Sequence, residues 1–206
     1  MAPSVRQTRG PCVESIHPVS AAAVHGGELR WHIGDDVVTT FRSASKPFQL
    51  ACSLEALGDP DVPDDLLAVG ASSHSAEAAH LTRVEAILRR FDAPADGLRC
   101  GAHAPVHTPS AEAILRAGGG YTALHNNCSG KHAFMLAAAL RNGWDADYRP
   151  FEHPLQQRIV GRLSAWMDHT PDHGIDGCGV PTFVQPLSAV ARATGTSTSG
   201  RTRPPS

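Results

Sequence analysis

The 206-residue sequence lacks the features that mark several large classes of protein. It has no apolar run approaching the roughly 18 residues that a membrane-spanning helix needs, so we expect no membrane association. The first 20 residues contain no apolar stretch typical of a secretory signal, and none is expected. The formal net charge is −2 and no basic stripe is present, which argues against nucleic acid as a partner.

A disulfide framework is also missing. The cysteines number five, which is an odd count, and they are scattered at positions 12, 52, 100, 128 and 178. This usage is typical of a reduced chain, so the sequence predicts a cytoplasmic protein. What is present is a hydrophobic fraction of 41%, which is enough for the core of one large domain.

The predicted elements run strands first and helices after. Val13–Val24 and Leu29–Ile33 predict a hairpin closed by Gly26 and Gly27, and a third strand is expected over 37–41. Helices are predicted at 43–58, 63–69, 75–91, 110–117, 129–142, 154–167 and 187–193, with a short strand at 182–184. This order indicates an α+β fold with an antiparallel sheet packed with helices. Because four strands make a thin sheet, either further strands are hidden in loops or some are missing.

The character of the sequence changes at Thr194. From there to Ser206 the chain has no aliphatic or aromatic side chain, so the segment 194–206 is predicted to be a disordered tail. The expected organisation is one domain over 1–193 followed by this tail.

Ser43 precedes Lys46 by three residues, where a predicted strand gives way to a helix. Residues three apart share a helix face, and a lysine whose pKa is lowered can take the proton of a serine nucleophile. Ser-x-x-Lys is a motif of acyl-transfer enzymes. The alternative is a helix-capping serine followed by a solvated lysine. Arg42 beside the serine could hold a substrate carboxylate, or it could be an exposed strand end.

Three further polar clusters carry chemistry. Ser75 follows His74 and opens a predicted helix, either as a second nucleophile or as an N-cap. Cys128 lies one helical turn before Lys131 and His132, an arrangement that suits a transition metal, a reactive thiol or a buried cysteine. The loop 174–181 contains three glycines and Cys178, and either approaches a ligand closely or is an ordinary turn.

Taken jointly, these segments resemble the rhizobial-type L-asparaginase II family over roughly residues 8–193. The matching segments are Thr8-Arg9-Gly10, Val13-Glu14-Ser15, Arg42-Ser43-Ala44-Ser45-Lys46-Pro47-Phe48-Gln49, Ser73-His74-Ser75, Asn126-Asn127-Cys128-Ser129-Gly130-Lys131-His132 and Asp176-Gly177-Cys178-Gly179-Val180-Pro181. The Asn-Cys-Ser-Gly-Lys-His and Asp-Gly-Cys-Gly segments are more specific than Ser-x-x-Lys.

The resemblance implies a fold like serine β-lactamases and glutaminases, and hydrolysis of L-asparagine to L-aspartate and ammonia. It implies Ser43 as the nucleophile, Lys46 as its base, and Ser75 as part of a second serine–lysine tandem. It implies a zinc site, not necessarily essential, next to the pocket, with the ligands Cys128, Lys131 and Cys178. The residues expected around the substrate are Arg42, Asn127, His132 and Asp176.

The chain departs from the family in length. Family members are much longer, and the lysine partner expected for Ser75 lies in the part that this sequence does not contain. We therefore expect a C-terminally truncated chain, with an inactive fragment or small-ligand binding module that retains the pocket as the alternative. A zinc hydrolase in which metal-bound water attacks is a third hypothesis. A homodimer stays an open alternative for the oligomeric state.

Overall fold

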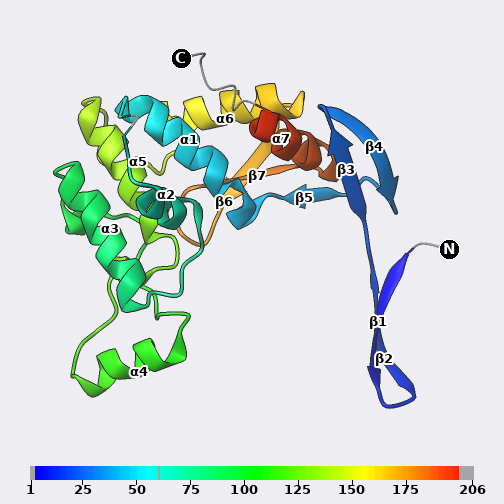
Figure 1. The fold of residues 1–206 in the computed structure, drawn as a ribbon, viewed down its shortest axis with the longest axis horizontal. Coiled ribbons are helices and arrows are strands. Elements are labelled where there is room, and N and C mark those ends of the chain that lie inside the picture. The colour runs from blue at the N-terminus through cyan, green and yellow to red at the C-terminus, as the bar shows by residue number, and fades with distance from the viewer. Residues whose placement is uncertain (1–2, 60, 200–206) are drawn as a thin grey trace. The chain divides into compact units, whose positions relative to one another are not determined.

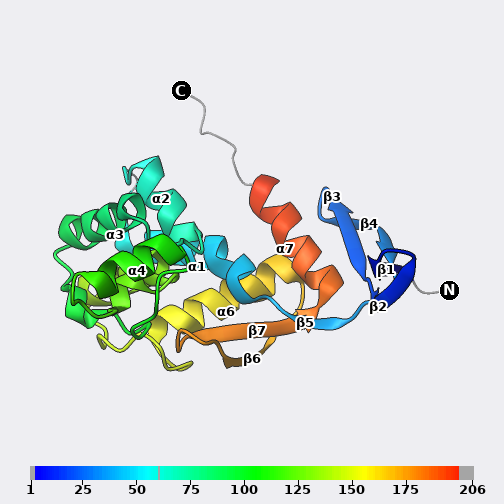
Figure 2. The same cartoon turned by 90° about the horizontal axis from the view of Figure 1, so that it is seen from below.

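The computed structural model describes residues 3–59 and 61–199. These residues form two compact units. Within the described part of the chain, the first unit comprises 3–41, 161–172 and 183–199, and the second comprises 42–160 and 173–182. Figures 1 and 2 show the elements of both units, and three elements, α6, β6 and β7, have residues in each of them.

Two antiparallel hairpins begin the first unit (Figure 1). β3 (Ala21–His25) pairs with β4 (Glu28–Ile33) around Gly26 and Gly27, whose φ angles of 60° and 80° suit a two-residue hairpin turn. The hairpin predicted at this turn is therefore confirmed. The first hairpin, β1 (Ser4–Arg9) with β2 (Cys12–Pro18), corrects the prediction, because the expected single strand from 13 to 24 is split between the two hairpins.

The remaining strands form a three-stranded sheet with the order β5-β7-β6. β5 (Val38–Thr40) pairs antiparallel with β7 (Pro181–Pro186), and β6 (Asp172–Ile175) is a strand that the sequence analysis missed. The described strands thus lie in three small sheets, so the expectation of one antiparallel sheet was wrong. The mixture of helices and antiparallel strands is consistent with the predicted α+β class.

In the second unit, α1, α2 and α3 all pack against α5 (Ser129–Arg141). Every residue from Ser129 to Ala139 is buried, as expected for a helix surrounded by other elements. The bounds of the other helices in this unit are α1 Lys46–Leu57, α2 Asp64–Ala71, α3 Ala78–Arg90 and α4 Thr108–Arg116. Figure 1 shows α4 apart from the other four.

A close approach between α2 and α5 depends on glycine. A Cβ atom built on Gly130 would lie 2.5 Å from the carbonyl oxygen of Val69, and one on Gly70 would lie 2.6 Å from the ring of Phe134. Neither distance is compatible with a side chain. This contact brings the start of α5 next to the end of α2, where the chain continues into Ser72 and Ser73.

Helix α6 (Pro154–Met167) has the predicted bounds, whereas α7 (Leu187–Ser199) runs past the predicted end at 193. The structure thus places Thr194–Ser199, six residues of the segment expected to be disordered, in a helix that packs against β3. Thr194 Oγ1 donates to the carbonyl oxygen of Ala191 at 2.8 Å, which supports the last turns. The rest of the predicted tail, 200–206, lies outside the described residues. In the described part of the chain, we find no helix with the length and apolarity needed to cross a bilayer.

Candidate active site

A cavity of about 240 Å³ lies within the second unit. Its walls come from four segments that are distant in sequence. The lining residues are Arg42, Ser43, His103, Asn126, Asn127, Cys128, Asp176, Gly177 and Cys178. Six of these are residues that the sequence analysis selected: Arg42, Ser43, Asn127, Cys128, Asp176 and Cys178. A larger hollow of about 490 Å³ in the same unit, beside Phe151 and His173, is lined by none of the selected residues.

A short 3₁₀ helix, Arg42–Ser45, lies just before α1 and forms part of the cavity wall. Arg42 has a φ of 47°, a left-handed conformation that costs a non-glycine residue about 1 kcal/mol or more. Such strain concentrates at functional sites. The Arg42 guanidinium lies 3.2 Å from the carboxylate of Asp176. The cavity wall thus presents a cation and an anion side by side, which is complementary to the charged ends of an amino acid.

Lys46 is the first residue of α1, and its side chain is buried. The ammonium nitrogen donates to Ser73 Oγ at 2.7 Å, to the Ser72 carbonyl at 2.9 Å and to the Asn127 carbonyl at 3.3 Å. Burial lowers the pKa of Lys46 from its usual 10.5, and the positive charge of Lys131 adds to this effect. The amine is therefore closer to its neutral, basic form than an exposed lysine would be.

Ser43 is exposed in the cavity wall, and the structure records no hydrogen bond between it and Lys46 among the described residues. The two residues are separated by one 3₁₀ turn, a spacing that puts side chains on the same side.

Within the described residues, Ser73 and not Ser75 is the serine whose side chain contacts this lysine. Ser75 instead donates to the carboxylate of Glu77 at 2.6 Å. It is not the N-cap either, because that position belongs to Glu77. The sequence analysis had both serines in one cluster and assigned Ser75 to the second tandem on the family resemblance. Only the fold of this irregular segment distinguishes them.

His74 fastens the Ser73 segment to the start of α5. Its backbone N–H donates to the Asn127 carbonyl at 3.2 Å, and its ring Nδ1 accepts the Ala76 N–H at 3.2 Å. The proton on Nε2 is therefore available to Ser129 Oγ at 2.9 Å, and Ser129 in turn donates to the Leu124 carbonyl. Burial lowers the pKa of His74 from 6.5 to about 4, so the ring is neutral at pH 7.

The two predicted thiols, although 50 positions apart, meet at the cavity. The interaction between the two side chains raises the pKa of Cys128 and lowers that of Cys178. The Cys128 thiol donates to Asn127 Oδ1 at 3.5 Å. The Lys131 ammonium donates to the Cys178 sulfur at 3.4 Å, which stabilises the thiolate. Asn126 orders this loop, because its Oδ1 accepts the backbone N–H of Cys128 at 2.9 Å.

His132 lies deeper than the sequence analysis expected. It is completely buried and is not among the cavity-lining residues. Its Nδ1 contacts the hydroxyl of Tyr148 at 2.8 Å. Burial lowers the pKa of His132 from 6.5 to about 4, while an interaction with the Cys178 sulfur acts in the opposite direction. The sequence analysis did not consider Tyr148, which belongs to none of the polar clusters.

A model of the L-asparaginase II family matches residues 5–205 of this chain. The chain belongs to the L-asparaginase II family. Membership supports an amidohydrolase of the asparaginase type, with hydrolysis of asparagine as its general activity. The match includes residues beyond 193. A search of curated proteins found no match.

The zinc ligands implied for this asparaginase II chain can be compared with the structure. Two sulfurs and one nitrogen, from Cys128, Cys178 and Lys131, adjoin one another. The thiols suit zinc, whereas Lys131, which donates to the Cys178 sulfur, would first have to lose a proton. Over the part of the chain that the structure describes, no group of three or more His, Cys, Asp or Glu residues could hold a metal. Any zinc site built on the thiols would therefore depend on the amine.

Proposed function

We propose that this chain hydrolyses L-asparagine to L-aspartate and ammonia through an acyl-enzyme on Ser43, with Lys46 as the base. The observation that carries the proposal is the buried amine of Lys46, with its lowered pKa, one 3₁₀ turn from a serine in the cavity wall. A Ser-x-x-Lys pair whose lysine has a lowered pKa supports acyl transfer, because the lysine can then take the serine proton.

The charged pair in the cavity supports binding of a small amino acid. Arg42 would bind the α-carboxylate in a bidentate manner, and Asp176 would accept from the α-ammonium group. A volume of about 240 Å³ accommodates a substrate of this size together with a water molecule. Asn127, also in the wall, would contact the side-chain amide of the substrate.

The chemical steps use groups already described. Neutral Lys46 takes the proton of Ser43, and the serine oxygen attacks the carbon of the side-chain amide. Backbone N–H groups at the start of α1 would stabilise the oxyanion. The protonated Lys46 then gives its proton to the departing ammonia. A water molecule attacks the ester while Lys46 takes its proton, and Lys46 then returns that proton to the Ser43 oxygen as aspartate is released.

Ser73 would assist Lys46 and replaces Ser75 in the mechanism. Its hydroxyl is 2.7 Å from the amine, so it can hold the amine in place and share its proton. Zinc, if held by Cys128, Lys131 and Cys178, would supply positive charge beside the substrate cavity. All five cysteines lie in described residues and none forms a disulfide, which supports a reducing compartment such as the cytoplasm.

Ammonia release from asparagine tests the proposal and separates it from a non-catalytic binding module. Ser43→Ala should lower kcat by about three orders of magnitude or more, with an unchanged circular dichroism spectrum. Ser73→Ala should lower kcat roughly a hundredfold. Ser75→Ala decides between the two serines, because it should leave kcat almost unchanged. Full turnover by the Ser43 variant, or a larger loss for Ser75→Ala than for Ser73→Ala, would contradict these roles. An acyl-serine trapped by mass spectrometry would exclude attack by metal-bound water.

A further inference from the structure

One segment of the cavity wall contributes a single residue, which neither the motifs nor the family resemblance selected. This residue is His103, which lines the cavity together with Asn126 and the loop 176–178. It lies in an irregular stretch between η2 (Ala95–Gly97) and α4, far in sequence from the other walls. Because no helix or strand fixes such a stretch, its place in the wall needs another cause.

The side-chain amide of Asn126 supplies that cause, because it joins two walls of the cavity. Its Nδ2 donates to the carbonyl oxygens of Cys100 at 2.8 Å and Gly101 at 3.2 Å. Its Oδ1 accepts the backbone N–H of Cys128 at 2.9 Å. Both N–H groups and the oxygen are thus in use, and the residue is only 5% exposed, so solvent does not readily replace these bonds.

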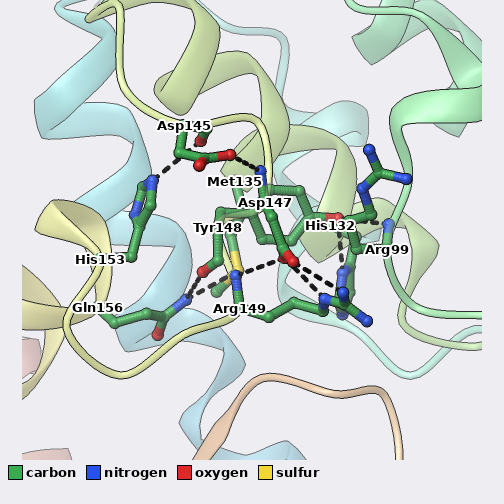
Figure 3. Close-up of polar contacts among 9 residues, drawn as sticks. All are labelled: Arg99, His132, Met135, Asp145, Asp147, Tyr148, Arg149, His153 and Gln156. Carbon is green, nitrogen blue, oxygen red and sulfur yellow. Dashed lines mark hydrogen bonds and ion pairs between the residues drawn. The ribbon is translucent and has the colours of Figure 1, made fainter.

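The stretch that carries His103 is also anchored at both ends. Figure 3 shows Arg99 beside Tyr148, whose hydroxyl accepts the backbone N–H of Arg99 at 2.8 Å. At the other end, the backbone N–H of His107 donates to the Ser75 carbonyl at 3.1 Å. The stretch therefore begins and ends at fixed points, and the asparagine amide holds it between them.

The ring of His103 is itself oriented. Its Nδ1 lies 2.6 Å from the Ala104 carbonyl oxygen, which can only accept, so Nδ1 donates. Within the described residues no partner is recorded for Nε2, which is therefore left for water or a ligand. The cavity wall thus contains one more polar side chain that could contact a bound molecule.

We propose that His103 contacts the substrate and that Asn126 is the positioning residue that holds it in the cavity wall. Arg42 and Asp176 are assigned to the α-carboxylate and the α-ammonium group, so the side-chain amide is the end of the substrate left for Nε2. The joining of the two walls depends only on the hydrogen bonds above, whereas asparagine as the ligand rests on the proposed function.

A double-variant cycle on the affinity for L-asparagine tests this, measured by calorimetric titration of the full chain carrying Ser43→Ala, which prevents turnover. Asn126→Asp keeps the oxygen that accepts the Cys128 N–H and removes both donors to the His103 stretch. His103→Ala removes the ring. Each change should raise Kd about fivefold, as expected for one lost hydrogen bond. Together they should also raise Kd about fivefold rather than about 25-fold, because both remove the same contact.

Asn142→Asp is the matched control, because Asn142 Nδ2 also donates to two carbonyls, those of Ala56 at 2.9 Å and Ala138 at 2.8 Å, and does not line the cavity. It should leave Kd unchanged. An unchanged Kd in His103→Ala, or a further loss when Asn126→Asp is added to it, would overturn the proposal. If Asn126→Asp does not fold, His103→Ala alone decides. The expected cycle, together with no ammonia release by the chain that retains Ser43, would uphold the inference and refute the proposed function.

Discussion

Burial of single titratable side chains gives this site its chemistry and also has a cost in stability. His74 is neutral in the folded chain because its pKa is about 4, against 6.5 in a solvated histidine. Between these two values the unfolded chain binds a proton that the folded chain does not bind. The free energy of unfolding therefore falls as the pH is lowered through this window, by up to about 1.4 kcal/mol per pH unit for one such group.

His74→Gln should remove this contribution, because glutamine does not titrate. Urea denaturation at several pH values between about 4 and 6.5 should give a slope of unfolding free energy against pH that is smaller by about 1 kcal/mol per unit than in the wild type. His25→Gln, at an exposed position in β3, is the control and should keep the wild-type slope. An equal slope in His74→Gln and wild type would show that folding does not lower the pKa of His74.

At the scale of elements, the contact between α2 and α5 brings together two groups that hold Lys46 of α1. They are Ser73, which follows α2, and the Asn127 carbonyl, which precedes α5. Gly130→Ala would ordinarily stabilise a helix by up to about 1 kcal/mol, but here the new methyl group would lie 2.5 Å from the Val69 carbonyl. The clash is with backbone, so we expect destabilisation by about 1–3 kcal/mol in chemical denaturation. Gly161→Ala in α6 has open space and should be neutral or stabilising. A stabilised Gly130→Ala would mean that the two helices separate easily.

The elements that the sequence predicted well are those with a local cause. Gly58 adopts a left-handed conformation and donates to the Leu54 carbonyl, which ends α1 as expected. The bounds of α6 follow from its apolar period and its initial proline. β1 was missed because all its residues are exposed and no apolar alternation marks it, whereas most of β2 lay within the single strand predicted over 13–24.

For the molecule as a whole, the chemistry depends on contacts that no local pattern contains. Lysine is rarely buried, so the burial of Lys46 by Ser73 and Asn127 was not predictable from its neighbours in sequence. The meeting of Cys128 with Cys178 was expected only from the family resemblance. No pattern in the sequence singled out Tyr148, because its partners, the backbone N–H of Arg99 and a ring on α5, are brought to it only by the fold.

Metal binding is a property of the whole chain, because a ligand that binds only the folded state stabilises all of it. If the thiol pair binds zinc, a zinc concentration about 100-fold above Kd should add about 2.7 kcal/mol and raise Tm by roughly 5–10 °C in calorimetry. The double variant Cys128→Ser, Cys178→Ser should lose both this shift and the bound metal measured by elemental analysis. Cys12→Ser, at an exposed cysteine of β2, should keep both, because that thiol contributes nothing to the cavity. An equal shift in the double variant and the wild type would place the metal elsewhere, and no shift in the wild type would remove zinc from the proposed function.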